Sequence, residues 1–309
     1  MQKFLKNIGI VSIPIIIYLI CIALIDPFNY LNKSHLVDSS LKKAISEEVS
    51  PHMFRLLDYE HHPRKNIILG DSRSNSLYYS LDPSRWANMT YGGGSLKEMI
   101  QTFWWVVEKQ ELDTVLIGIN LNLYNKNNRR FYVEQTIESL KYYVSYAFNK
   151  NVFRSSFLIL KSELSKKEVQ LNKTGLSKEE FWEQHLNTFP QKFYSNMVYP
   201  EEYHALLAEI SDYCAQKNIK LIFWIPPTHI DLQNAVKKYD VDEMDLRFKN
   251  DLRSLGELYD YNYPCKITEE KENFRDPVHF TYEIAVQIRD ELLRGQIFCA
   301  KHSEKENAP

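Results

Sequence analysis

Short apolar runs alternate with amphipathic stretches along most of the chain, and this alternation predicts a parallel β-sheet covered by helices. Strands are expected at residues 66–69, 113–120 and 219–225, where apolar runs stop at a glycine, a proline or a polar side chain. A last short strand is expected at residues 258–263. Strands separated by helical stretches are typical of α/β proteins, in which helices cover both faces of the sheet.

The helical stretches carry their own start signals. Ser95 and Glu98 form the S-x-x-E pattern of a capping box, which predicts that a helix begins there. Three more helices are expected. The first, at residues 200–217, has apolar positions on one face, and those at 241–255 and 282–294 are followed by the stop residues Gly256 and Gly295. The predicted fold class is therefore α/β, a three-layer α/β/α arrangement of the flavodoxin-like kind with a mostly parallel sheet.

The N-terminal residues combine basic charge with a long apolar run. Lys3 and Lys6 precede an uncharged stretch at residues 8–25, and Asp26 follows it. As a helix this stretch would reach about 27 Å, close to the roughly 30 Å hydrocarbon core of a bilayer. Basic residues before the span predict a cytoplasmic N-terminus at residues 1–7 and an extracytoplasmic chain beyond, periplasmic in a Gram-negative cell.

A cleaved signal peptide is the alternative to an anchor. No small residues in an A-x-A-like arrangement follow the apolar run, so we expect an uncleaved, single-pass transmembrane helix. The remaining divisions are a juxtamembrane segment at 26–63, a main domain at 64–299 with a helical insertion at 126–199, and a disordered tail at 300–309.

The juxtamembrane segment and the insertion both contain patterns that predict helices. Within the juxtamembrane segment a helix is expected at residues 41–49, with Pro51 ending it. The strand pattern weakens within the insertion, which contains helical stretches at residues 131–148 and 153–165 and a second capping box at Ser177. We expect this insertion to cover one side of the active face and to select the substrate.

Charge and cysteine content exclude some functions. Lys plus Arg (38) and Asp plus Glu (40) give a formal charge of −2, so a nucleic-acid partner is not expected. The cysteines form no C-x-x-C pair and no Cys/His cluster, so no metal or other cofactor is expected. Beyond Cys21 in the apolar run, Cys265 and Cys299 are the best candidates for a disulfide, and buried free thiols are the alternative.

Side chains suited to acyl chemistry stand where the predicted strands end. Ser72 follows the first strand in the run Gly70-Asp71-Ser72, which would present its hydroxyl at the carboxyl edge of the sheet. Asp276 and His279 lie three residues apart before the last helix. At this spacing the carboxylate can fix one ring nitrogen while the other faces outward, as a general base beside a serine requires. Ser72, His279 and Asp276 are thus candidate catalytic residues.

Two further stretches could supply hydrogen-bond donors to this site. The run Gly92-Gly93-Gly94 enters a predicted helix and would leave backbone N–H groups exposed, and Asn120 ends the second strand. These residues and His279 could also have purely structural roles. The glycines could form only a tight turn, and Asn120 could be only the turn residue at the end of its strand. His279 could be only a residue at the entry to a helix.

Taken together, four blocks resemble the SGNH (GDSL-type) hydrolase superfamily in chain order. They are Gly70-Asp71-Ser72, Asn88 with Gly93, Gly118-Ile119-Asn120, and Asp276-Pro277-Val278-His279. The resemblance covers residues 64–125 and 200–295. It implies an SGNH fold in which Ser72 is the nucleophile, His279 the general base and Asp276 the acid that orients it.

The resemblance also implies an oxyanion hole. Its three donors would be the backbone N–H of Ser72, the backbone N–H of Gly93 and the side-chain amide of Asn120, with Gly92 or Gly94 as substitutes for Gly93. Donors aimed at a developing oxyanion stabilise the transition state, and removing one typically costs about 2.7–4 kcal/mol.

Two positions depart from the family pattern. Arg73 stands where the family usually has leucine, and Leu121 replaces an aspartate that often follows the asparagine. A serine followed by arginine, behind an N-terminal anchor, is more similar to the membrane-bound acyl-transfer members, which O-acetylate alginate and peptidoglycan or help load D-alanine onto teichoic acids. Arg73 could bind an anionic part of the substrate or form a structural salt bridge. His229 could be a substrate contact or a loop residue.

The expected function is that of a membrane-anchored serine esterase or O-acyltransferase acting on envelope or extracellular glycan. The acyl group, acetyl in the simplest case, would pass from Ser72 to water or to a sugar hydroxyl. The expected partners are the membrane, an ester or glycan substrate and a polytopic membrane acyltransferase. The alternative is a non-catalytic polysaccharide-binding or scaffold component of an envelope complex, which would be favoured if Ser72 and His279 lay far apart.

Overall fold

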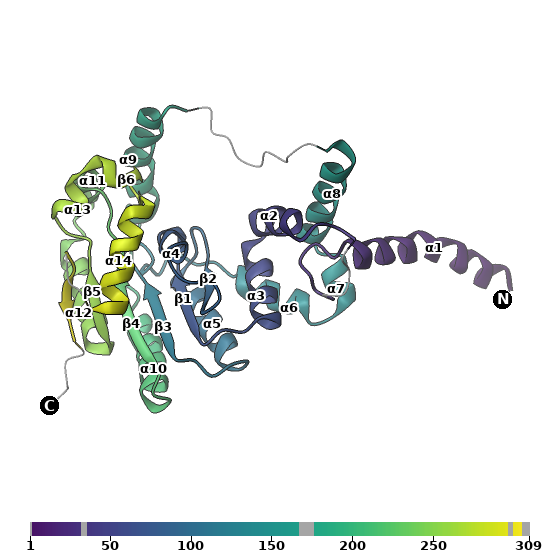
Figure 1. The fold of residues 1–309 in the computed structure, drawn as a ribbon, viewed down its shortest axis with the longest axis horizontal. Helices are drawn as coiled ribbons and strands as arrows, with labels where there is room; N and C mark the ends of the chain where they lie inside the picture. The colour runs from purple at the N-terminus through teal and green to yellow at the C-terminus, as the bar shows by residue number, and fades with distance from the viewer. Residues whose placement is uncertain (1, 32–35, 167–175, 296–298, 305–309) are drawn as a thin grey trace. The chain divides into compact units, whose positions relative to one another are not determined.

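The computed structural model describes residues 2–31, 36–166, 176–295 and 299–304, with side chains described from Ser12 onward. The chain forms two compact units, each built from two segments of sequence (Figure 1). One unit combines Met1–His62 with Tyr132–Thr174, and the other combines Pro63–Phe131 with Gly175–Pro309. The division separates residues 132–174 of the predicted insertion from its remainder, which belongs to the unit with the sheet.

A six-stranded sheet forms the centre of the second unit. In spatial order its strands are β2 (Trp86–Thr90), β1 (Asn66–Gly70), β3 (Thr114–Gly118), β4 (Lys220–Ile225), β5 (Glu257–Asp260) and β8 (Lys301–Ser303). The first five strands are parallel, and β8 pairs antiparallel with β5. The predicted α/β fold with a mostly parallel sheet is confirmed. Central strands are apolar at nearly every position because helices cover both of their faces.

Helices pack on the two faces of this sheet. On one face α4 (Ser72–Tyr78) contacts β1, β2 and β3 and also α14 (Tyr282–Arg294). On the other face α5 (Leu96–Val107) packs with β1 and β2, α10 (Glu201–Gln216) with β4 and α12 (Asp242–Leu255) with β5. The three layers of the predicted architecture are therefore present.

Alternate strand residues fill the core beneath α4 and α14. Ile68, Leu116 and Ile222 lie side by side in register on neighbouring strands and are fully buried with Trp224 and Ile288. Burying a side chain of this size contributes roughly 1.5–3 kcal/mol, so this cluster fixes the helix that begins at the candidate serine.

One long helix, α9, and several short elements complete the second unit. They are α9 (Lys178–Tyr194), α11 (Ile230–Val236), η1 (Lys237–Tyr239), α13 (Lys266–Glu269), η2 (Lys271–Asn273), β6 (Phe274–Asp276) and β7 (His279–Phe280). Both predicted capping boxes are present, at Ser95 and at Ser177. Gly295 ends α14 with φ +67°, a left-handed conformation that glycine adopts without a steric penalty.

The other unit is helical. It contains α1 (Gln2–Ile25), α2 (Ser39–Val49), α3 (Pro51–His61), α6 (Tyr132–Leu140), α7 (Tyr143–Ala147) and α8 (Lys150–Ser165). Ile22, Phe28, Met53 and Leu57 are buried together with residues of α7 and α8. The hydroxyl of Tyr18 donates to the carbonyl of Ala147 at 2.6 Å, so the C-terminal half of α1 contacts α7.

Among the residues the structure describes, no helix has both the length and the apolar character required to cross a membrane. The large apolar side chains of α1 that are exposed are Ile13, Ile15, Ile16, Ile17, Ile20 and Leu24.

Two sequence predictions outside the site need correction. Pro51 begins α3 rather than only ending α2, because the first turn of a helix needs no N–H from that position. The predicted tail at 300–309 is wrong at its start: Lys301–Ser303 form β8, since Ala300 is buried and β5 offers an unpaired edge. Residues 305–309 lie outside the described residues.

Candidate active site

Ser72 is the first residue of α4 and follows directly after β1. Asp71 is the N-cap, and its carboxylate accepts a hydrogen bond from the backbone N–H of Arg73 at 2.9 Å. Helix α4 approaches the sheet closely at this point. A Cβ added to either Gly70 or Gly118 would lie 2.0 Å from the Ser74 hydroxyl oxygen, so only glycine fits at the ends of β1 and β3. These glycines let the helix carry Ser72 at the carboxyl edge of the sheet.

His279 and Asp276 face each other across the hairpin of β6 and β7. The Nδ1 atom of His279 lies 2.9 Å and 2.8 Å from the two carboxylate oxygens of Asp276. One of those oxygens also accepts the backbone N–H groups of Val278 at 2.9 Å and His279 at 3.0 Å. The turn between them closes a short two-stranded ladder, in which Asp276 lies opposite His279.

The carboxylate of Asp276 remains ionised at neutral pH. Burial raises the pKa of this group, but the hydrogen bond and charge of His279 and the Val278 N–H outweigh burial, and the net pKa is lowered. An ionised acceptor beside Nδ1 requires that Nδ1 carry the proton. The Nε2 atom of His279 is then free to accept a hydrogen bond.

Ser72 and His279 meet although they are 207 residues apart in the chain. The Oγ atom of Ser72 lies 2.7 Å from Nε2 of His279, and with Nδ1 protonated the hydroxyl is the donor. This distance is within the range for a nucleophile and its general base. The structure therefore brings Ser72, His279 and Asp276 into one hydrogen-bonded chain. The large separation that would have favoured a non-catalytic protein is not found.

Two of the three predicted oxyanion donors are free to bind a ligand. Within the described residues, the backbone N–H groups of Ser72 and Gly93 donate to no protein acceptor. Gly93 has φ +63°, which the glycine turn allows, and the Arg130 guanidinium lies over it. Asn88 is structural: its amide donates to the side-chain oxygen of Asn75 at 2.8 Å and so connects β2 to α4.

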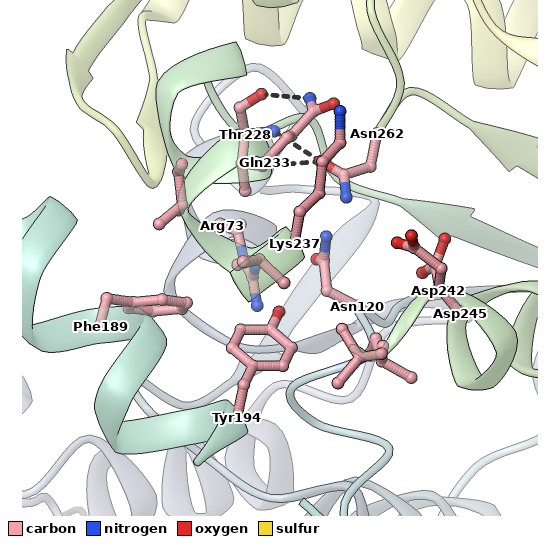
Figure 2. Close-up of a pocket in the computed structure, with 14 residues that line it drawn as sticks. Arg73, Asn120, Phe189, Tyr194, Thr228, Gln233, Lys237, Asp242, Asp245 and Asn262 are labelled. Atoms are coloured by element: carbon pink, nitrogen blue, oxygen red, sulfur yellow. Dashed lines mark hydrogen bonds between the residues drawn. The ribbon is translucent and has the colours of Figure 1, made fainter. Parts of the chain in front are cut away.

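Asn120 is placed differently from the prediction. Its side chain is buried, and Nδ2 donates to the carbonyl oxygen of Pro226 at 2.9 Å. An amide nitrogen has two N–H bonds, so one remains for an oxyanion. The Oδ1 atom of Asn120 (Figure 2) is buried and accepts no hydrogen bond from the residues that the structure describes.

Arg73 is a structural side chain at this edge of the sheet. Its guanidinium is almost fully buried, forms an ion pair with Asp71 and donates to Asn122 Oδ1 at 2.8 Å. Of the two roles considered from sequence, the structure shows the salt bridge. Asn122 was not identified from sequence, since a single asparagine after a strand gives no periodic signal.

His229 is the N-cap of helix α11. It is buried, and its Nδ1 accepts the backbone N–H of Asp231 at the start of α11. Its ring packs against Trp182 and Phe274, and its own backbone N–H donates to the carbonyl of Pro277 at 2.9 Å. The loop that carries His229 therefore contacts the segment that carries Asp276 and His279.

Among the described residues, no three His, Cys, Asp or Glu side chains gather as a metal site. The site therefore offers a hydroxyl, an imidazole, a carboxylate and N–H donors, which together are suited to acyl transfer.

Comparison with known proteins found similar solved structures at low identity, and three of them are described here. No family model and no curated protein matches the chain. A candidate acylhydrolase from Bacteroides fragilis is 11% identical with a TM-score of 0.40, covering 78% of this chain and 94% of that one. A GDSL-like lipase from Bacteroides thetaiotaomicron is 10% identical with a TM-score of 0.38, covering 75% and 89%. A candidate platelet activating factor from Streptococcus pneumonia is 9% identical with a TM-score of 0.41, covering 84% and 97%.

Proposed function

We propose that this protein is a serine ester hydrolase or acyltransferase of the SGNH (GDSL) type, with Ser72, His279 and Asp276 as its catalytic residues. The observation that carries the proposal is the 2.7 Å contact between Ser72 Oγ and His279 Nε2, with Asp276 on the opposite ring nitrogen. A serine, a histidine and an acid in this order of contacts perform acyl transfer on several unrelated folds.

The reaction has two steps. Ser72 Oγ attacks the ester carbonyl carbon while its proton passes to Nε2 of His279, and the N–H groups of Ser72 and Gly93 bind the oxyanion. The bond to the leaving alkoxide then breaks, and that oxygen takes the proton from His279, which leaves an acyl group on Ser72. A water molecule or an acceptor hydroxyl attacks the acyl-enzyme in the same way and restores the serine.

Substitution of the serine tests this proposal. Ser72→Ala should abolish labelling by a fluorophosphonate probe and hydrolysis of p-nitrophenyl acetate, since it removes the hydroxyl that contacts His279 Nε2. Ser76→Ala, on the same helix, is the matched control and should retain both activities. Undiminished labelling and hydrolysis in Ser72→Ala would refute the assignment.

The proposal extends to the cell envelope. Residues 8–25 carry no charge, and exposed isoleucines such as Ile13, Ile16 and Ile20 lie on the described part of α1. They support an anchor that holds the enzyme at the outer side of a membrane, where glycans and lipid-linked sugars are the available esters and acceptors. Deleting residues 2–25 should move the protein from the membrane fraction to the soluble fraction. A full-length chain already in the soluble fraction would contradict the anchor.

Hydrolysis and transfer share the same catalytic residues, so only the acceptor separates them. A polytopic membrane acyltransferase would be a suitable source of acyl groups for transfer to glycan. Incubating the enzyme with an acetyl ester and an oligosaccharide, and measuring acetylated sugar against free acetate, distinguishes the two activities.

A further inference from the structure

Helix α8, in the helical unit, has an exposed apolar stripe. Its large apolar side chains recur at intervals of three and four residues, which places them along one face of the helix. The residues of this stripe are Phe153, Phe157, Leu160 and Leu164. Each of them is between 45% and 86% exposed. Single exposed apolar residues are common on protein surfaces, but a stripe along a whole helix marks a contact with an apolar partner.

The inner face of α8 is more polar than this stripe. The buried residues of the helix are Val152, Ser155, Ser156, Ile159 and Ser162. Most of them are serines, whereas the stripe contains only phenylalanine and leucine. A helix that faces water normally has the reverse arrangement, with its apolar residues inside. Small residues between helices, with large apolar residues outside, are typical of helices in contact with lipid.

Neighbouring helices of the same unit also expose apolar side chains. Helices α1, α7 and α8 contact one another (Figure 1). Phe148, which follows α7, is exposed, and its ring centroid lies 5.3 Å from that of Tyr18 in α1. Ile25 of α1 is buried in one cluster with Ile159 of α8. The exposed isoleucines of α1, such as Ile20, are therefore carried by a helix that packs directly against α7 and α8.

Cations lie along one side of the stripe. At about 3.6 residues per turn, three basic residues project within about 100° of Phe153, all in the same direction around the helix. They are Lys150, Arg154 and Lys161, and all three are exposed. Glu163, the acidic residue of α8, projects on the other side of the stripe. Basic side chains beside an apolar face can reach anionic lipid headgroups while their methylene groups stay in the apolar layer.

We propose that the α8 stripe and its flanking cations bind the interfacial layer of a membrane that contains anionic lipids. The phenylalanine and leucine side chains would enter the boundary between headgroups and acyl chains, and the cations would contact the lipid phosphates. This mode of binding requires no helix that crosses the bilayer. It is also independent of the ester chemistry proposed for Ser72.

A lipid surface suits this face better than a second copy of the chain does. Two copies would bring two sets of the same cations together, which is electrostatically unfavourable. An anionic bilayer supplies both the apolar layer and the opposite charge.

Tryptophan quenching by brominated lipid tests this contact. The five native tryptophans all belong to the unit with the sheet, so Phe157→Trp adds a reporter to the helical unit. Leu246→Trp, at an exposed position of α12, is the matched control. Each full-length variant is incorporated into vesicles of phosphatidylcholine and phosphatidylglycerol, with or without bromine on the acyl chains, and the wild-type emission is subtracted.

The two reporters should behave differently. Brominated acyl chains should reduce the added emission of Phe157→Trp at least about twofold, because an interfacial helix buries its apolar face at the acyl boundary. The added emission of Leu246→Trp should not change. Omitting phosphatidylglycerol should weaken the quenching, since the cations then lose their anionic partner. Quenching that is independent of phosphatidylglycerol would overturn the role of the cations.

A further variant separates the stripe from α1. Phe153→Ser and Leu164→Ser are added to Phe157→Trp, and both replace exposed side chains, so the helical circular dichroism should be kept. The quenching should fall to less than about half of its value, because most of the apolar area of the stripe is removed. Unchanged quenching would show that α1 alone holds the unit at the bilayer, and the proposal would be wrong.

The remaining outcomes also decide the proposal. Equal emission of Phe157→Trp with and without bromine, or a chain that does not bind the vesicles, would overturn it. An unquenched reporter whose emission shifts to shorter wavelength as the protein concentration rises would assign the stripe to a second copy instead. The esterase assignment would stand in each case, because fluorophosphonate labelling of Ser72 tests it separately.

Discussion

Arg73 and Asp71 form a buried ion pair that flanks Ser72 on both sides in the chain. The Nε atom of Arg73 lies 3.2 Å and 3.0 Å from the two carboxylate oxygens of Asp71, and the guanidinium is 1% exposed. The same carboxylate is the N-cap of α4, so Asp71 both neutralises the charge of Arg73 and fixes the start of the helix. Removing either partner should therefore affect both stability and the position of the nucleophile.

Arg73→Met should lower the free energy of unfolding by about 3–5 kcal/mol, because it leaves the Asp71 carboxylate buried without its cation. The double variant Asp71→Asn with Arg73→Met should be more stable than Arg73→Met alone, since asparagine can still cap α4 without a charge. Urea unfolding followed by circular dichroism measures the free energy of unfolding of the single and the double variant. A loss below about 1 kcal/mol in the single variant would show that water reaches Asp71.

Asp276→Asn should reduce kcat by up to about 10⁴-fold with little change in KM, because an amide no longer holds the proton on Nδ1 of His279. The amide oxygen can still accept the N–H of Val278, so the thermal midpoint should move little. Ester hydrolysis kinetics and a thermal melt on the same sample separate the two effects. Full activity in this variant would exclude a triad.

Gly118→Ala should destabilise the protein by about 1–3 kcal/mol and lower kcat, because its Cβ would lie 2.0 Å from Ser74 Oγ and displace α4. Adding Ser74→Ala should restore part of the stability, although Trp224 also lies within 2.8 Å of that Cβ. Gly92→Ala is the control, since its Cβ would meet nothing within 4 Å. Equal behaviour of the two glycine variants would rule out a close approach of helix and sheet.

His229 should make stability depend on pH. Burial lowers the pKa of its imidazole below 6.5, Asp231 opposes this in part and Lys271 adds to it. The unfolded chain then takes up a proton before the folded chain does, so stability is full above about pH 6.5 and decreases as the pH falls below it. His229→Asn can still cap α11 and should flatten the stability profile between about pH 7 and 5. An unchanged profile in urea unfolding would contradict this role.

Cys265 and Cys299 should form a disulfide in an oxidising compartment. Their sulfur atoms lie 2.6 Å apart across 34 residues of sequence, and both are thiols in the structure. A disulfide that acts as oxidant by thiol–disulfide exchange would take up the two thiol hydrogens. The new disulfide would join Cys299, which lies just before β8, to Cys265. Closing a loop of this length typically contributes about 2–4 kcal/mol.

Alkylation of the unfolded, non-reduced protein followed by mass spectrometry tests the disulfide. Cys214, buried in α10, should be alkylated and serve as the internal control, while Cys265 and Cys299 should be protected until reduction. Alkylation of all three without reductant would show that the pair remains reduced.

Local sequence patterns determined most of the secondary structure. Capping residues such as Ser95 and Ser177, the stop at Gly295 and the continuous apolar strands act over a few neighbouring residues, so they can be identified without the fold. The same applies to the candidate nucleophile, because a polar residue after a buried strand of a parallel sheet lies at its carboxyl edge.

The tertiary structure decided the contacts that depend on distant residues. The turn of Asn120 toward Pro226, the salt bridge of Arg73 and the capping role of His229 each depend on a partner that the local pattern does not specify. The division of residues 126–199 between two units and the pairing of β8 with β5 depend on which apolar surfaces remain uncovered. Short-range propensities act within a turn of helix or strand, whereas buried polar groups select their partners only after the chain has packed.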